Sequence, residues 1–171
     1  MKKSSMYSVG AVVIAGTLLA GCSSLTAPFR DADPRWADFK SWTKVTVEPG
    51  TGNPTGFLGG LHMGDEGYRD VYVNAVGEEA LVGSAPYNFP EGTVIVKEQF
   101  ANKADWEAGR KAAHTVSLKV AASDELAKEN WIWADSYKGS AGESAFCSAC
   151  HSIAAADDYV FTHGDFLKTQ E

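Results

Sequence analysis

The sequence predicts an α+β fold: a mainly antiparallel β-sheet with a few short helices, one of them near the C-terminus. Two observations lead to this prediction. Several segments of the 171-residue chain alternate apolar with polar residues, which is the period of a half-buried strand. A Cys-x-x-Cys-His motif at residues 147–151 has the spacing of one helical turn. The alternating segments leave no room for the long amphipathic helices of a bundle.

A helix is predicted to open the folded part of the chain. Asp33 is suited to the N-cap and Pro34 to the first helical position, and the helix would run through Trp36 and Phe39 to about Trp42.

Strands are predicted where the alternation follows. A loop rich in Gly and Pro, residues 49–60, separates the first two strands, and residues 75–83 and 123–130 are predicted as short helices or turns. Because the alternating segments are short and closely spaced, an antiparallel sheet is expected. The predicted strands are residues 44–48, 69–73, 93–100, 114–121 and 131–137.

The motif Cys147-Ser148-Ala149-Cys150-His151 predicts a covalently attached haem c, one per chain. Thiols about one turn apart can each add to one haem vinyl group, and His151 then lies under the iron as its ligand. A zinc site would need further ligands, and the chain has one other cysteine. A dithiol redox pair is the other alternative, but it leaves His151 unexplained.

The N-terminus predicts export. Lys2 and Lys3 precede an apolar run over residues 9–20, which is short for a membrane span, so residues 1–21 are interpreted as a signal peptide. Leu19-Ala20-Gly21-Cys22 resembles the lipobox of bacterial lipoproteins, which implies acylation of Cys22; a free or disulfide-bonded Cys22 is the alternative. Ser23 follows in place of aspartate, which favours the periplasmic face of the outer membrane over the inner membrane.

Three parts of the chain are therefore expected: the signal peptide 1–21, a tether 22–30 and one domain, 31–171. Cleavage removes Lys2 and Lys3 but no acid, which leaves 13 basic and 22 acidic residues and a net charge of −9. An acidic chain without a cluster of Lys and Arg argues against nucleic acid, and the Cys22 lipid would bring it to the membrane.

The haem motif lies late in a β-rich chain, and further segments accompany it: residues 69–74, 89–98, 129–131 and 159–162, besides the motif at 147–151. In these segments the sequence resembles the cytochrome P-460 family, which includes cytochrome c′-beta. The resemblance implies an open iron site opposite the histidine, a small nitrogen-oxide ligand or substrate, and a homodimer.

The resemblance also implies roles for Lys97 and Arg69. Lys97 stands where the P-460 members have a lysine linked to the haem edge, although c′-beta members lack that bond. A buried lysine can lose its proton and become nucleophilic, which suits such a link. Arg69 would lie beside the haem and hold a bound nitrogen oxide or a water. From the residues alone, Lys97 on a solvated edge strand and Arg69 at the surface are the alternatives.

Three functions are compatible with these residues. The first is oxidation of hydroxylamine or nitric oxide, with electrons passed to a periplasmic cytochrome. The second is capture of nitric oxide without turnover. It is considered because oxidation needs a proton acceptor and residues 114–121 contain no acid, although His114 or His62 could accept the proton instead. The third is electron transfer, with Met63 or His62 closing the iron site.

Overall fold

A computed structural model of the chain describes residues 31–46, 68–123 and 129–165. Several predictions lie outside these residues and are not addressed by the structure: the signal peptide, the tether, lipidation of Cys22, and the roles of His62 and Met63.

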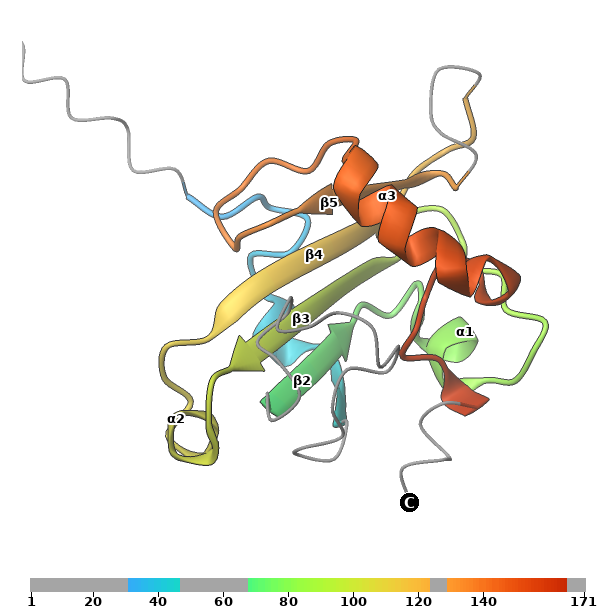
Figure 1. Cartoon of the computed structure of the whole chain (residues 1–171). Coiled ribbons are helices and arrows are strands. Elements are labelled where there is room, and N and C mark those ends of the chain that lie inside the picture. The colour runs from blue at the N-terminus through green and yellow to red at the C-terminus, as the bar shows by residue number, and fades with distance from the viewer. Residues whose placement is uncertain (1–30, 47–67, 124–128, 166–171) are drawn as a thin grey trace, which may run out of the picture.

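The centre of the fold is a five-stranded antiparallel sheet in which each strand pairs with the next along the chain, in the order β1-β2-β3-β4-β5 (Figure 1). This arrangement confirms the predicted α+β class. The strands are β1 (Thr43–Thr46), β2 (Tyr68–Val73), β3 (Val94–Phe100), β4 (Ala113–Lys119) and β5 (Trp131–Ala134).

Short helices surround the sheet. Helix α3 lies over the sheet at one end of β4 and β5, and α2 lies at the opposite end (Figure 1). Within the three described ranges, no helix is long and apolar enough to span a membrane. The helices are α1 (Glu78–Val82), α2 (Lys103–Glu107), α3 (Ala145–His151) and the 3-10 helix η2 (Ser152–Asp157).

The predicted helix over 33–42 is wrong. The structure has turns followed by a single 3-10 helix, η1 (Phe39–Ser41). Trp36 is fully buried, and its Nε1 donates to the carbonyl of Tyr137 at 2.8 Å. Trp36 and Phe39 are both buried against the sheet, and residues three apart eclipse each other in a 3-10 turn. Burial of these two rings therefore overrides the local helix signal.

Two strands also end earlier than predicted. β4 ends at Lys119, and β5 ends at Ala134 because the chain turns, with the Gly139 N–H donating to the Ser136 carbonyl at 3.0 Å. Helix α2 was not predicted, although Asn102 caps it by accepting a hydrogen bond from the Asp105 N–H at 2.9 Å.

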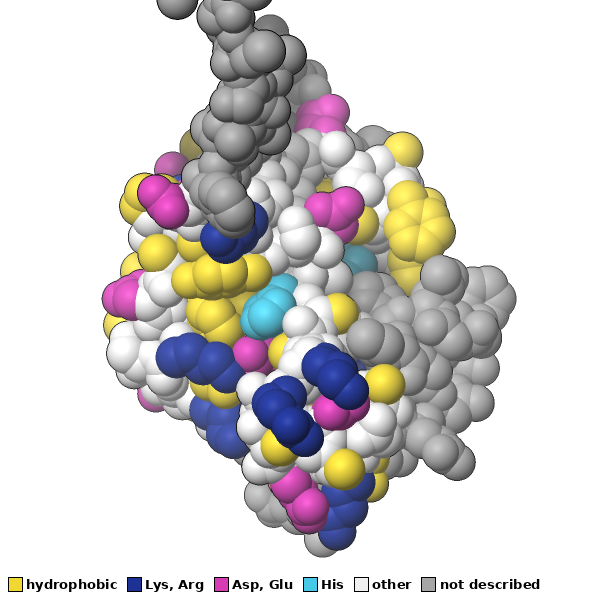
Figure 2. Space-filling model, turned by 90° about the vertical axis from the view of Figure 1, so that its left-hand side faces the viewer, with side chains coloured by type: hydrophobic (Ala, Val, Ile, Leu, Met, Phe, Trp, Pro, Cys, Tyr) yellow, Lys and Arg dark blue, Asp and Glu magenta, His cyan; other side chains and the backbone are white. Residues whose placement is uncertain are grey.

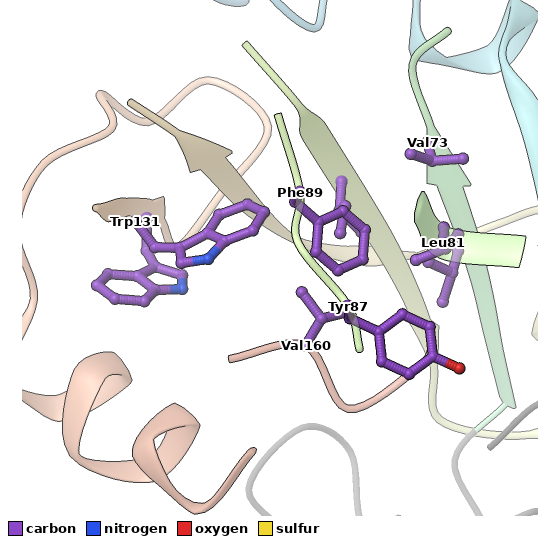
Figure 3. Packing of buried hydrophobic residues seen from close by; sticks show 9 residues of the cluster. Val73, Leu81, Tyr87, Phe89, Trp131 and Val160 are labelled. Atoms are coloured by element: carbon purple, nitrogen blue, oxygen red, sulfur yellow. The ribbon is translucent and has the colours of Figure 1, made fainter. Parts of the chain in front are cut away.

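Each face of the sheet carries its own apolar cluster. The face covered by α3, called the α3 face below, packs Val71, Val73, Ile95 and Trp133 together with Phe89, Leu81 and Val160 (Figure 3). The opposite face packs Val94, Val96, Val116 and Leu118 against the N-terminal segment. Because side chains alternate along a strand, the odd-numbered residues of β3 point to the α3 face and the even-numbered ones away from it.

Candidate functional site

Helix α3 presents the two cysteines of the motif. Ser144 is its N-cap, and its Oγ accepts a hydrogen bond from the Cys147 N–H at 3.2 Å. Cys147 and Cys150 are free thiols, both half-buried, and Cys147 packs against the α3-face cluster. The helical spacing that the motif predicted is confirmed, with both thiols one turn apart.

His151 is the last residue of α3, and its ring is oriented by one hydrogen bond. Nδ1 lies 2.6 Å from the carbonyl oxygen of Tyr159. Because a carbonyl only accepts, Nδ1 carries the proton and Nε2 keeps a lone pair free to bind a metal. The ring centroid lies 5.8 Å from that of Trp133 and 5.2 Å from that of Phe161. Burial lowers the pKa of His151, which favours the neutral, ligating form.

The Tyr159 carbonyl is held in place by an unusual turn. Asp158 and Tyr159 both have left-handed backbones, with φ of 50° and 65°. The Asp158 carboxylate accepts hydrogen bonds from Lys119 Nζ at 2.5 Å and from the Phe89 N–H at 2.8 Å. Trp131 Nε1 donates to the Asp158 carbonyl at 2.9 Å. Asp158 therefore ties the turn that positions His151 to β4, to β5 and to the segment before β3.

Lys97 lies on the central strand, β3, and on the α3 face. It is half-buried, so the alternative of an exposed edge-strand lysine is wrong. Burial, and to a lesser extent the charge of Arg69, lower the pKa of Lys97 to about 7, although Cys150 and Cys147 act in the opposite direction. Lys97 therefore shares the α3 face with the cluster that Cys147 packs against, and the charges of Arg69 and of both thiols affect its pKa.

Arg69 is buried on β2, where it pairs with Gln99 of β3. The surface alternative for Arg69 is therefore wrong. By alternation Arg69 shares the α3 face with Val71 and Val73. The structure thus brings five predicted site residues to one face of the sheet: Arg69, Lys97, Cys147, Cys150 and His151.

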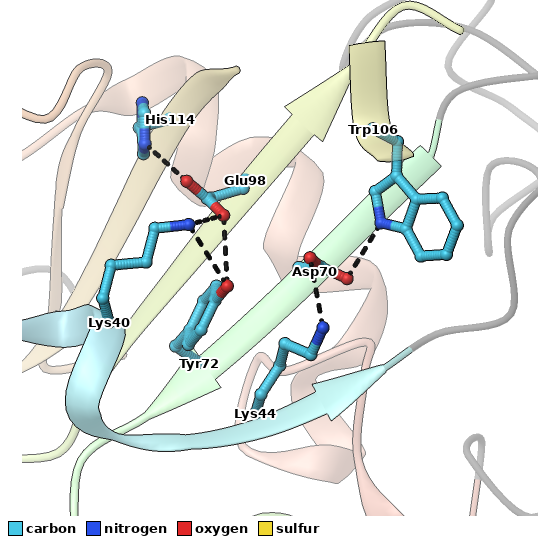
Figure 4. Close-up of polar contacts among 7 residues, drawn as sticks. All are labelled: Lys40, Lys44, Asp70, Tyr72, Glu98, Trp106 and His114. Carbon is cyan, nitrogen blue, oxygen red and sulfur yellow. Dashed lines mark hydrogen bonds and ion pairs between the residues drawn. The ribbon is translucent and has the colours of Figure 1, made fainter. Parts of the chain in front are cut away.

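His114 does not belong to this group. It lies on the opposite face, where its Nε2 is 3.1 Å from Glu98 Oε1 (Figure 4). Glu98 also accepts hydrogen bonds from Lys40 and from the Tyr72 hydroxyl. The prediction that His114 could accept a proton at the site is therefore wrong, because alternation along β4 turns Thr115 and Ser117 to the α3 face instead.

Three buried polar atoms have no hydrogen-bond partner in the described part of the chain: Gln99 Oε1, Trp133 Nε1 and Glu129 Oε2. The other oxygen of Glu129 accepts a hydrogen bond from Ser148, which lies between the two cysteines. The sequence alone gave neither Gln99 nor the Glu129 side chain a role in the site. The alternation that places Lys97 on the α3 face also places Gln99 there, whereas nothing local indicates the contact of Glu129 with Ser148.

This set of groups fits a haem. Among the described residues, no cluster of three or more His, Cys, Asp or Glu side chains could hold a metal ion by itself. An iron already held by a macrocycle needs only one imidazole from the protein, which His151 offers, and the two thiols suit covalent attachment. Unpartnered buried groups on the same face are expected where a cofactor or its ligand completes the contacts.

The charged surface does not indicate a polyanionic partner on the face drawn in Figure 2, where Lys and Arg side chains lie interspersed with Asp and Glu.

A family model described as Cytochrome P460 matches residues 36–162, a range that contains all five strands and α3. No curated protein matches the chain.

Proposed function

Because the chain belongs to the cytochrome P460 family, which carries haem, we propose that it is a mono-haem c-type cytochrome that oxidises hydroxylamine or nitric oxide. The observation that supports this proposal most strongly is that Arg69 and Lys97 lie on the sheet face that α3 covers, the helix that carries both thiols, and that His151 presents its free Nε2 there.

In this proposal three residues attach one haem. Cys147 and Cys150 would form the thioether bonds, and His151 would bind the iron. The hydrogen bond to the Tyr159 carbonyl orients the imidazole and increases its basicity. The rings of Trp133 and Phe161 pack near the imidazole.

Lys97 is proposed to form a further bond to a carbon of the haem edge, which replaces one C–H and one N–H bond, releases two protons and passes two electrons to an oxidant of the dioxygen or peroxide class. A pKa of about 7 means that much of the amine is neutral at physiological pH, and a neutral amine has the lone pair that such a bond requires. Its place on the central strand sets the face of the sheet from which the side chain starts.

When bound, the haem supplies an iron that coordinates the substrate nitrogen and accepts electrons. Arg69 is proposed to hold the polar end of that ligand. Oxidation of hydroxylamine also releases protons, which need an acceptor. Electrons would pass to a periplasmic cytochrome.

A second candidate is capture of nitric oxide without turnover. The observation in its favour is that β4 turns Ala113, Thr115 and Ser117 to the α3 face, so this strand brings no carboxylate to accept a proton. Electron transfer with a closed iron site is a third candidate, whose proposed ligands His62 and Met63 lie outside the described residues.

The first test is the visible spectrum of the reduced, purified protein before and after addition of hydroxylamine. A broad, strongly red-shifted Soret band would support a lysine-modified haem and oxidation. An ordinary high-spin spectrum that responds only to nitric oxide would support the capture function. Sharp low-spin bands that ignore both ligands would contradict both and support electron transfer.

A mass measurement tests the attachment. The variant Cys150→Ala should retain at most one thioether, and a Cys147→Ala/Cys150→Ala variant should retain covalent haem only if Lys97 is bonded to it. Combining this double variant with Lys97→Ala should then release the haem completely. Covalent haem in that triple variant would contradict all three assignments.

We also propose that the mature protein is a periplasmic lipoprotein, held at the outer membrane by acylated Cys22 and forming a homodimer. Membrane fractionation tests the anchor: Cys22→Ala should move the haem protein out of the membrane fraction, and an unchanged distribution would contradict the lipid. Light scattering of the detergent-solubilised protein tests the dimer.

A further inference from the structure

The side chain of Gln99 is buried without a hydrogen bond at its acceptor. Gln99 is 3% exposed, and its Oε1 has no partner in the part of the chain that the structure describes. Leaving a buried carbonyl oxygen unpaired is unfavourable, so such an atom in a native fold calls for an explanation. A group that binds beside Gln99 and donates a hydrogen bond would provide one.

Gln99 belongs to the same face as the proposed haem site. On β3 it is two residues beyond Lys97, and side chains two apart on a strand share a face with a separation of about 7 Å. Its cross-strand neighbours are Arg69 on β2 and Ala113 on β4. Ala113 offers no polar side chain, so Arg69 is the cross-strand neighbour with a polar group.

The register shows on which side of Lys97 this pair lies. Helix α3 meets the sheet at the row that contains Ile95 and Trp133, where the His151 ring contacts Trp133. Lys97 is in the next row, and Gln99 and Arg69 are in the row after it. The pair therefore lies on the side of Lys97 away from His151, as expected for groups near a ligand held opposite the histidine.

The two side chains offer complementary chemistry. A guanidinium only donates hydrogen bonds. Because Arg69 is positively charged and is the cross-strand neighbour of Gln99, it favours the orientation of the Gln99 amide in which the carbonyl oxygen, rather than the NH₂ group, is nearer to Arg69. A small ligand between them could accept from Arg69 and donate to Gln99 Oε1. Hydroxylamine has both lone pairs and N–H and O–H groups, whereas nitric oxide has no hydrogen to donate.

Given the haem placement proposed above, on which this step rests, we propose that Gln99 is a specificity-determining residue. Its Oε1 accepts a hydrogen bond from the ligand opposite His151, and it thereby favours hydroxylamine over nitric oxide. Loss of this acceptor weakens ligands that carry N–H or O–H groups and leaves nitric oxide binding unchanged.

The test compares two ligands on ferric, haem-loaded protein, under anaerobic conditions without an electron acceptor. Gln99→Leu should weaken hydroxylamine binding about tenfold, the contribution of one hydrogen bond, and change nitric oxide binding by less than about twofold. Gln99→Glu, which keeps an acceptor of the same shape, should retain hydroxylamine binding. Gln99→Met, a flexible replacement, is measured in parallel in case leucine impairs folding.

Thr115→Val is the matched control, because Thr115 shares the face of Gln99 but lies in the row of Lys97. The proposal is overturned if Gln99→Leu and Gln99→Met weaken both ligands equally, if they weaken neither, or if Thr115→Val gives the same selective loss. A wild-type protein that binds neither ligand would instead refute the proposed function, so the two failures are distinguishable.

Discussion

Lys119 of β4 and Asp158 form an ion pair of 2.5 Å across 39 residues of sequence, with side chains only 11% and 13% exposed. Asp158 precedes Tyr159, whose carbonyl orients His151. The pair therefore connects the sheet to the residue proposed to ligate the iron.

Asp158→Asn is expected to destabilise the fold by about 2 to 4 kcal/mol, because removing one partner leaves the Lys119 charge nearly buried and unpaired. Asparagine tolerates the left-handed backbone at this position, so backbone strain does not contribute. Denaturant unfolding measures the change. Resonance Raman spectroscopy of the reduced protein should also show a shifted iron–histidine band.

The matched control is Glu107→Gln, which breaks the exposed pair of Lys103 and Glu107 and should cost no more than about 0.5 kcal/mol. Equally small losses of stability in the two variants would show that the Lys119–Asp158 pair stabilises the fold no more than an exposed ion pair does.

Glu98 should make the fold sensitive to acid. Burial alone would raise the pKa of Glu98, but hydrogen bonds from His114 and Lys40 outweigh it and hold the pKa below its usual value (Figure 4). A depressed carboxyl pKa contributes stability that is present above the unfolded pKa of about 4.3 and is lost as pH falls through the folded pKa.

Glu98→Gln should therefore be less stable than the wild type at neutral pH, and the difference in their free energies of unfolding should decrease as the pH falls below about 4. Urea unfolding of both proteins between pH 3 and pH 7 measures this difference in the free energy of unfolding. The hydrogen-bond partners of Glu98, which are Tyr72, Lys40 and His114, are the same in both proteins. A gap that stays constant with pH would show that Glu98 stabilises by packing alone.

Lys97 should titrate well below other lysines when no haem is bonded to it. In a Cys147→Ser/Cys150→Ser variant, acetylation of Lys97 should reach half its maximal rate near pH 7, because burial and then Arg69 disfavour the ammonium form. Mass spectrometry of peptides compares it with Lys103, whose side chain is 64% exposed. Parallel profiles for the two lysines would exclude a special environment at Lys97.

Gly164 lies against the end of α1, and a side chain has no room there. An added Cβ would come 2.1 Å from the carbonyl oxygen of Gly83, a backbone atom that cannot rotate away. Gly164→Ala should destabilise the fold by about 1 to 3 kcal/mol. Gly142→Ala is the control, because a Cβ there meets nothing within 4 Å. Thermal unfolding distinguishes them, and similar melting temperatures would mean that the chain near Gly164 moves freely.

The alternation of side chains made part of the site predictable. On β3 it separates Lys97 from Glu98, and the motif places Cys147 and Cys150 one turn apart, because both patterns depend only on local backbone geometry. The same rule failed to choose a face for His114, because alternation does not indicate which side of the sheet a distant helix will cover.

Local signals were also overridden where packing was strong. The N-cap pattern at Asp33 predicted a helix, yet the Asp33 carboxylate bonds to Arg35 and the burial of Trp36 sets the path of the chain. Trp36 contacts the carbonyl of Tyr137, 101 residues away, and no local pattern contains such a contact.

The sequence by itself determined the chemistry that this chain can carry: two thiols and a histidine at the spacing of a helix, and a lysine on a strand. Only the tertiary structure decided that these groups share one face with Arg69 and Gln99, and that the Tyr159 carbonyl leaves His151 Nε2 free. The physical reason is that spacing along the chain sets local geometry, whereas burial and hydrogen bonds between distant segments decide which groups meet.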